Sequence, residues 1–210
     1  MDTQLLNTRQ RLLEAAGEVF AERGFQAATV KEICQRAEAN IAAINYHFRD
    51  KSGLYTEVVN YTQQRAKEKY IQALDSAKSP EERLRKFIST ILQRILDAGR
   101  PAWHGKLMAR EMIDPTPVLD SIVKESVVPL LTMFHDVIRE ILGPGVDETK
   151  VQFAARSIIG QCLYYSHSRP VIERLEPQFD YSPNGIQKIA DHVSAFSIAA
   201  LKQMRTDASV

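Results

Sequence analysis

The spacing of apolar residues constrains the fold of this chain more than any other feature of its sequence. Between clusters of glycine and proline, apolar side chains recur at positions i, i+3, i+4 and i+7, the pattern of amphipathic helices. Strict two-residue alternation, which marks half-buried strands, is not sustained anywhere. Hydrophobic residues make up 44% of the 210 positions, enough to bury a core. The sequence therefore predicts an all-α protein.

Capping and breaking residues place the ends of these helices. Gly24 is expected to end the first helix with a positive φ, Asp147 to cap a late helix and Pro183 to open the last one. The helix over 117–142 is apolar on nearly every side, which predicts a buried, central position, and Pro129 should kink it. The remaining helices are expected at about 8–23, after Thr29, at 41–47, from the turn at 49–52 to about 77, and at 80–99, 102–112, 148–167 and 183–205.

Residues 29–47 are predicted to form a helix, a short turn and a second helix of about two turns. Thr29 and Glu32 make a capping box at the start of the first helix, and Asn40 is placed to cap the second. This arrangement is typical of the helix-turn-helix, whose second helix enters the major groove of DNA. Many helical hairpins share the same spacing, so geometry alone leaves a purely structural hairpin open.

The residue types on and beside the second helix favour contact with DNA. Small alanines let a helix backbone approach the groove, asparagine can read adenine, and tyrosine, histidine and lysine are suited to phosphate oxygens. The free amides that begin the preceding helix also favour a phosphate. Ile44 and Phe48 are expected to point into the core. The candidate DNA-binding residues are Thr29, Lys31, Asn40, Ala42, Ala43, Asn45, Tyr46, His47 and Lys51.

The stretch from Thr8 to Tyr61 strongly resembles the DNA-binding domain of the TetR family of transcriptional regulators. The resemblance rests on four segments in one order, LLEAA at 12–16, FAERGF at 20–25, ATVKEI at 28–33 and NYHFRDK at 45–51. The turn over 37–40 departs from the family's usual Ala-Gly-Val-Ser, and Asn45 stands where tyrosine is common. Residues 40–55, and the body around 104–142 and 157–171, are similar to the CecR-like subgroup.

This resemblance implies a helix-turn-helix head over residues 5–65, with its motif at about 28–47, and a ligand-binding and dimerisation body over 66–210. The long helix that begins near residue 51 would be the hinge between them. The implied function is that of a homodimeric transcriptional repressor that binds a pseudo-palindromic operator in double-stranded DNA. A small-molecule effector would release it from that operator.

The resemblance also implies an effector pocket in the body. Polar groups among apolar side chains on several expected helices are the candidates for its lining. An ordinary core with hydrogen-bonded polar ends is the alternative for each of them. The candidates are Trp103, His104, Met108, Glu111, Met112, Phe134, His135, Cys162 and Tyr165.

The last two long helices have apolar faces wider than a single core contact requires, which indicates a partner. The resemblance implies a four-helix interface to which each subunit contributes two helices. A monomer with a thick core is the alternative. The candidate interface residues are Phe153, Ile158, Ile159, Val193, Phe196, Ala200, Leu201 and Met204.

Other classes of protein fit the sequence less well. A helical-bundle enzyme with a di-iron site would need Glu-x-x-His pairs, and none of the five histidines has a glutamate three positions before it. The common phosphate-binding and nucleophile motifs are also absent from the sequence. A helical adaptor that does not bind DNA would leave the cluster Asn45-Tyr46-His47 unexplained. We therefore expect neither an enzyme nor an adaptor.

Cysteine usage and hydropathy bear on the compartment. The only two cysteines, Cys34 and Cys162, have no metal-ligand or disulfide-framework spacing, which favours a reducing compartment. No apolar run is long enough for a membrane span, and the first residues do not have the pattern of a secretory signal. We expect a cytoplasmic protein without a metal, a cofactor or a membrane partner.

The charge balance at first argues against a DNA-binding protein, because such proteins are usually basic. The chain has a formal charge of +1, and residues 1–51 carry seven Lys and Arg against seven Asp and Glu. Attraction to DNA must therefore depend on where the charges lie. Glu14, Glu18 and Glu22 share one stripe of the first helix, which we expect to face away from DNA. Few phosphate contacts also predict a shallow salt dependence of binding.

Overall fold

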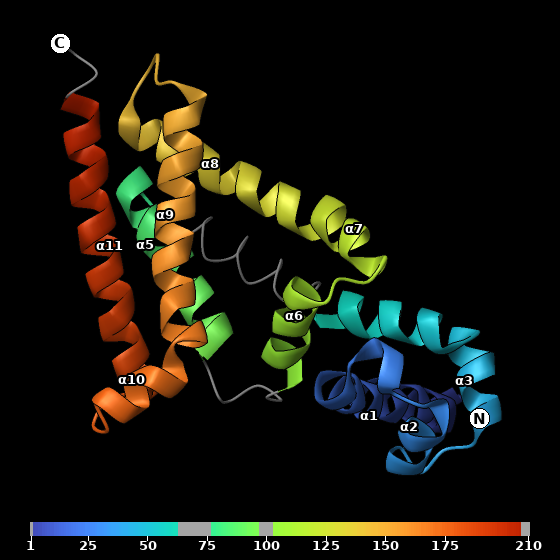
Figure 1. Cartoon of the computed structure of the whole chain (residues 1–210). Helices are drawn as coiled ribbons and strands as arrows, with labels where there is room; N and C mark the ends of the chain where they lie inside the picture. The colour runs from blue at the N-terminus through green and yellow to red at the C-terminus, as the bar shows by residue number, and fades with distance from the viewer. Residues whose placement is uncertain (1, 63–76, 97–102, 207–210) are drawn as a thin grey trace. The chain divides into compact units, whose positions relative to one another are not determined.

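The computed structural model describes residues 2–62, 77–96 and 103–206, and all regular structure in these residues is helical. This confirms the all-α prediction. The contacts divide the chain into two compact units (Figure 1). The N-terminal unit comprises Met1–Arg65 and Gly99–Ser126, and the C-terminal unit comprises Ala66–Ala98 and Val127–Val210. None of the described helices is both long enough and apolar enough to cross a membrane.

The N-terminal unit is built on α1, whose apolar stripe forms the centre of its core. Leu12, Val19 and Phe20 of this stripe are fully buried, as are Ile33 and Ile44 of the next two helices. A further helix over residues 51–62 completes the packing of the first part of the chain. The labelled helices of the unit are α1 (Asp2–Ala27), α2 (Val30–Arg36), α3 (Ile41–Phe48), α6 (Trp103–Ile113) and α7 (Val118–Ile122).

The end of α1 is bent at Gly24, as its sequence predicts. Gly24 has φ 79° and ψ 167°, a conformation that side chains with a Cβ rarely adopt. The helix ladder resumes after this bend and continues to Ala27, so α1 ends later than predicted. Two carbonyl groups near the end of α1 accept hydrogen bonds from a residue distant in the sequence. Arg110 donates to the oxygens of Ala21 and Glu22 at 3.3 and 3.2 Å.

Helix α6 packs against α1, although the sequence prediction placed it in the body. The indole of Trp103 is 5% exposed and lies on Gly17, where an added Cβ would come within 2.4 Å of the Trp103 ring. Gly17 thus permits the close approach of the two helices. Because α6 belongs to the N-terminal unit by its contacts, the compact units do not coincide with the predicted division at residue 65. Where the functional domains divide stays a prediction.

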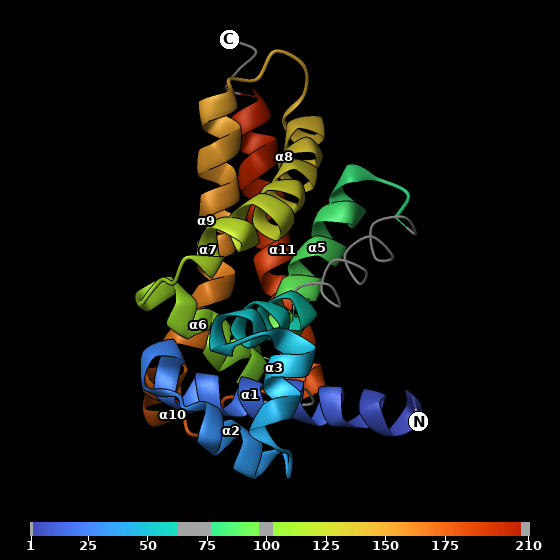
Figure 2. The ribbon, with the colours of Figure 1, turned by 90° about the vertical axis from the view of Figure 1, so that its right-hand side faces the viewer.

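The C-terminal unit is a bundle in which four long helices pack on one another. Phe87 and Phe134 stack at its centre with ring centroids 4.3 Å apart, and both are buried. Helices α9 and α11 lie side by side in both Figure 1 and Figure 2. The helices are α5 (Pro80–Leu96), α8 (Val128–Leu142), α9 (Glu148–His167), α10 (Arg169–Leu175) and α11 (Pro183–Thr206).

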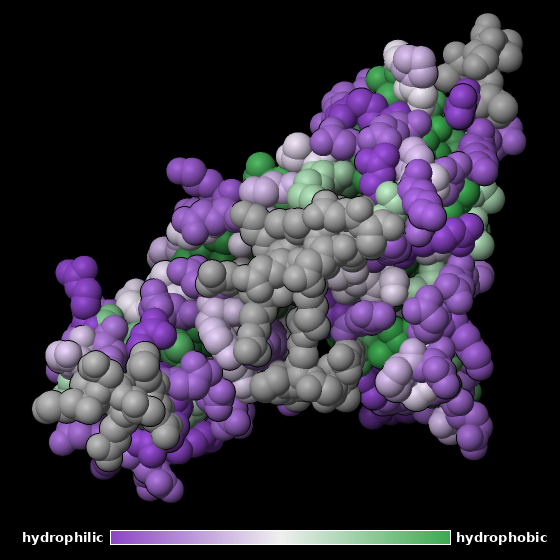
Figure 3. Space-filling view, turned by 180° about the vertical axis from the view of Figure 1, so that it is seen from behind, coloured by the Kyte–Doolittle hydropathy of each residue, from purple (hydrophilic) through white to green (hydrophobic). Residues whose placement is uncertain are grey.

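Several predicted boundaries in this unit are confirmed. Asp147 caps α9 by accepting from the Thr149 amide at 3.1 Å, and Pro183 opens α11. Helix α8 ends at Leu142, as predicted, and Gly143 follows it with φ 94°. The short helix α10 was not predicted; seven residues are too few for a clear apolar period. The surface seen in Figure 3 is mostly hydrophilic, with hydrophobic residues in separate patches. This agrees with apolar side chains gathered in the interior.

The single buried helix predicted over 117–142 is wrong. The structure divides it into α7, a π-helical segment Val123–Val127 and α8. Pro129 lacks an amide hydrogen and its ring crowds the carbonyl four residues earlier, which a wider turn relieves. Val123, which begins the π-helical segment, and Val128, which follows it, are 41% and 51% exposed. The core of the C-terminal unit uses only the part of the segment that lies in α8.

Candidate nucleic-acid interface

The helix-turn-helix is positioned by the two predicted N-caps. The Thr29 hydroxyl accepts from the Glu32 amide at 3.1 Å, and the Asn40 side chain accepts from the Ala42 amide at 3.1 Å. The Glu32 carboxylate lies 3.5 Å from Arg23 and 3.9 Å from Arg36. The structure thus places α2 and α3 where the sequence predicted them.

Helix α3 has one buried face and one exposed face. Ile44 and Phe48 are 0% and 3% exposed, which confirms that they anchor the helix in the core. Ala42 and Asn45 are exposed on the other face, and Tyr46 is 75% exposed. The candidates Thr29, Lys31 and Asn40 are also exposed, while Ala43, His47 and Lys51 are partly buried. Together, the exposed candidates leave one side of α3 open to a partner.

Ile41 was not among the sequence candidates, yet it lies on the same exposed face of α3. As the first residue of the helix it is 49% exposed. Helical spacing alone places Ile41 beside the buried Ile44 and Phe48 as well as beside Asn45, so only the structure shows that it is half exposed.

Lys51 is held by several groups of the head. Its ammonium donates to the carbonyl oxygens of Gln26 and Ala28 at 3.2 and 3.0 Å, and lies 4.7 Å from the centre of the Phe25 ring. An ammonium has three donor hydrogens, so one remains for another acceptor after these two bonds. Lys51 therefore has a structural role in the turn before α2, and its contact with a phosphate stays a prediction.

The acidic stripe of α1 is partly neutralised within the unit. Arg36, at the end of α2, donates to Glu22 at 3.0 and 3.1 Å and to Glu18 at 3.4 Å. The hydrogen bonds from Arg36 lower the pKa of Glu22. This pairing turns the two carboxylates toward the C-terminal end of α2 rather than leaving them as free charges.

Family models match both parts of the chain. The model described as "Bacterial regulatory proteins, tetR family" matches residues 12–58, and that of the C-terminal domain of the HTH-type transcriptional dual regulator CecR matches residues 80–201. The second match alone spans more than half of the chain. The chain belongs to the TetR family of transcriptional regulators. Both family models describe transcriptional regulators, which favours regulation over the enzyme alternative.

Relatives of the chain are also transcriptional regulators of the helix-turn-helix type. The chain is 27% identical to the transcriptional regulator UidR of Escherichia coli K12 over 115 residues, which cover 55% of the chain and 57% of UidR. It is 24% identical to CecR of Shigella flexneri over 174 residues, or 78% of either protein. The match with UidR thus spans less than two thirds of that relative.

A crystal structure of AibR in complex with isovaleryl coenzyme A and operator DNA has the same fold. It superposes with a TM-score of 0.66 at 18% sequence identity, over 90% of this chain and 97% of that one. At this identity the likeness concerns the fold alone.

The predicted pocket residues fall in both units of this TetR-family protein. Trp103, His104, Met108, Glu111 and Met112 belong to α6 in the N-terminal unit, and Phe134, His135, Cys162 and Tyr165 belong to the C-terminal unit. Each group is therefore described within its own unit. That they contact an effector stays a prediction.

Glu111 is a buried carboxylate with three donors around it. It is 1% exposed, and it accepts from the Thr116 amide and hydroxyl, each at 2.8 Å, and from the Tyr55 hydroxyl. Burial and the bond to Glu111 raise the pKa of Tyr55, so its hydroxyl stays protonated. These bonds join the helix over 51–62 to α6 and to the loop after it, which sequence reasoning did not predict.

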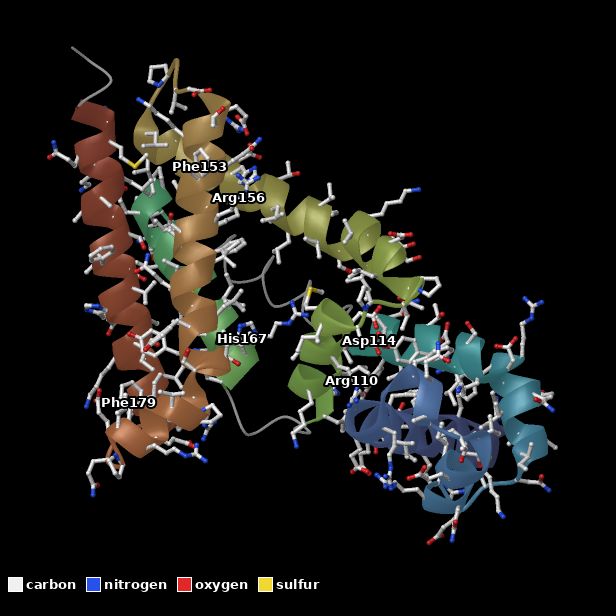
Figure 4. All side chains as sticks on the ribbon, viewed as in Figure 1. Arg110, Asp114, Phe153, Arg156, His167 and Phe179 are labelled. Carbon is white, nitrogen blue, oxygen red and sulfur yellow. The ribbon has the colours of Figure 1, made fainter. Side chains whose placement is uncertain are left out.

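A small cleft of the N-terminal unit borders this cluster. It is lined by Phe25, Gln26, Tyr55, Arg110 and the segment 114–117. Arg110 and Asp114 lie at the C-terminal end of α6 (Figure 4). Of the sequence candidates for an effector pocket, none lines this cleft.

The pocket candidates of the C-terminal unit have contacts within its core. Phe134 stacks on Phe87, and Cys162 is fully buried, where burial raises the pKa of its thiol to about 12. Tyr165 accepts at its carbonyl from the Tyr181 hydroxyl at 3.3 Å. These contacts are those of an ordinary core, the alternative that the sequence left open.

The predicted dimer residues separate into two groups. Ile158, Val193 and Leu201 are 3%, 1% and 2% exposed, so their side chains pack inside their own unit. Phe153 and Phe196 are 61% and 60% exposed. Ala200 is exposed as well, and Ile159 and Met204 are partly buried. Periodicity marked both apolar sides of α9 and α11 without distinguishing the outward side.

Proposed function

We propose that this TetR-family regulator is a homodimeric repressor whose α3 helices bind two half-sites of a pseudo-palindromic operator. The supporting observation is the exposed face of α3, which Ile44 and Phe48 hold outward from the core. The N-terminal residues of such a helix contact base edges in the major groove. The residues proposed to contact DNA are those of the sequence prediction, Thr29, Lys31, Asn40, Ala42, Ala43, Asn45, Tyr46, His47 and Lys51.

A second copy of the chain is the proposed partner of α9 and α11. Phe153 and Phe196 project from these neighbouring helices and are more than half exposed. Figure 4 shows Phe153 and Arg156 along α9, and the Arg156 guanidinium lies 5.7 Å from the Phe153 ring. Ala195, Ala199 and Gly160 are exposed small residues on the same helices, which permit close helix packing. Exposed aromatic rings beside small residues support a helical interface.

A small molecule is the proposed release signal. AibR, which has the same fold, was crystallised in complex with isovaleryl coenzyme A and operator DNA. An effector that binds more tightly to the conformer that does not bind DNA lowers the affinity for the operator. The operator lowers the affinity for the effector by the same factor. No covalent step is required, only a difference in effector affinity between the two conformers.

Gel-shift titration with duplex DNA selected from a random library tests DNA binding by α3. Asn45→Ala/Tyr46→Ala removes two exposed side chains without touching the core, so the fold should persist. Loss of the base contact of Asn45 and the phosphate contact of Tyr46 is expected to weaken binding about 10- to 100-fold, since one good base contact contributes about 1–3 kcal/mol.

Asn184→Ala is the matched control for this titration. Asn184 is exposed in the C-terminal unit, and its replacement should leave affinity unchanged. Failure of the native protein to select any duplex at low salt would contradict the proposal. Undiminished binding by the double variant would contradict the role of α3.

A further inference from the structure

The outward face of α3 begins with a large aliphatic side chain. Ile41 is 49% exposed, whereas Ile44 one turn later is fully buried. With a helical period of 3.6 residues, Ile41, Ala42, Asn45 and Tyr46 lie on one side of α3, and their burial agrees with this. The face proposed to read DNA therefore begins with an isoleucine at the first helical position.

Core packing explains only part of the Ile41 side chain. Ile41 lies three and seven positions before the buried Ile44 and Phe48, at the edge of their apolar stripe, yet it remains 49% exposed. The cap of the helix is supplied by Asn40, whose side chain accepts from the Ala42 amide. The exposed part of Ile41 is thus free to contact a partner.

The major groove offers one apolar group, the C5-methyl of thymine. Residues at the N-terminal end of a recognition helix are those that reach base edges. On the outward face of α3, Ala42 is small enough to let the backbone approach, and Ile41 supplies an aliphatic surface beside it. The near-neutral charge of the head also leaves more of the discrimination to uncharged contacts.

We propose that Ile41 is a specificity-determining residue, which packs on a thymine methyl in each half-site. This inference rests on the proposed binding of DNA through α3. It assigns Ile41 to base reading, separate from the phosphate contacts that position the head.

A uracil scan tests the contact. Duplexes are selected from a random library by the full-length protein, and each thymine is then replaced singly by deoxyuridine, which removes the methyl and keeps base pairing. For the native protein, one replacement in each half-site should weaken binding about fourfold, the factor for one apolar carbon group removed from water. Ile41→Ala should bind the thymine duplex more weakly and lose its sensitivity to that same replacement.

Ile113→Ala is the matched control, because Ile113 is an isoleucine of the N-terminal unit that is 83% exposed on another helix. It should retain the native uracil profile. Circular dichroism establishes that each variant is folded.

Two results overturn the inference in distinguishable ways. If duplexes are selected but the uracil scan is flat, or Ile41→Ala keeps the native profile, Ile41 does not read a methyl while DNA binding stands. If no duplex is selected at all, the proposed function fails together with the inference.

Discussion

Glu111 illustrates how burial changes the meaning of a single residue. In the sequence it is a polar group on an apolar helix, and it was therefore a pocket candidate. In the structure it is buried and accepts hydrogen bonds from Tyr55 and Thr116. A buried carboxylate is tolerated only when such donors replace water. Its partners lie 56 and five positions away, so the more distant bond could not be predicted from local spacing.

Tyr55→Phe should destabilise the protein by about 1.5–3 kcal/mol, because a charge-assisted hydrogen bond to a buried carboxylate is lost. The ring packing on Phe20 and Phe25 is retained, so the hydroxyl alone is tested. Urea unfolding followed by circular dichroism measures the change. Tyr164→Phe serves as the control, since Tyr164 is 55% exposed and its hydroxyl is free to bond water. Equal stabilities of the two variants would contradict a stabilising role for the bond.

The turn after α3 depends on a glycine that the sequence prediction did not single out. Arg49 adopts φ 72°, and the Asp50 carboxylate accepts from the Gly53 amide at 2.8 Å, so the chain reverses into the helix over 51–62. A Cβ on Gly53 would lie 2.1 Å from the Phe48 carbonyl oxygen. The close approach of the backbone at residue 53 to the end of α3 is therefore possible only with glycine. This turn fixes the direction of α3 against the rest of the head.

Gly53→Ala should destabilise the protein by about 1–3 kcal/mol and weaken DNA binding, because backbone must move to accept the new methyl group. Thermal unfolding and gel shift measure the two effects. Gly105→Ala is the control, because a Cβ on Gly105 of α6 would meet nothing within 4 Å. In a helix it should be neutral or stabilising by about 0.5–1 kcal/mol. If Gly53→Ala behaved like Gly105→Ala, the turn would be more adaptable than its geometry indicates.

At the scale of the whole molecule, the outward faces of α9 and α11 bear on assembly. Phe196→Asp places a charge where a ring is 60% exposed, so it should leave the folded chain intact and break the proposed dimer. Analytical ultracentrifugation should find dimers for the native protein and monomers for the variant. DNA affinity should fall as well, because two linked heads bind more tightly than one.

Ile113→Asp is the control for assembly, as Ile113 is more exposed than Phe196 and lies in the other unit. It should remain dimeric. A dimeric Phe196→Asp variant, or a monomeric native protein, would contradict the proposed interface.

The sequence by itself determined the helical class, the helix-turn-helix and its two caps, because each depends on residues within about one or two turns of one another. Thr29, Asn40, Ile44 and Phe48 occupy the places that this local reasoning predicted. The resemblance to the TetR family rested on four segments that the family model also matches.

Only the tertiary structure decided which apolar face of a helix is inside. It placed Trp103 on Gly17, buried Val193 and Leu201, and left Phe196 exposed. A helical period reveals that a stripe is apolar, but the elements that cover the stripe come from distant parts of the chain. Burial and exposure are therefore settled by packing, which is why periodicity did not distinguish the inward from the outward sides of α9 and α11.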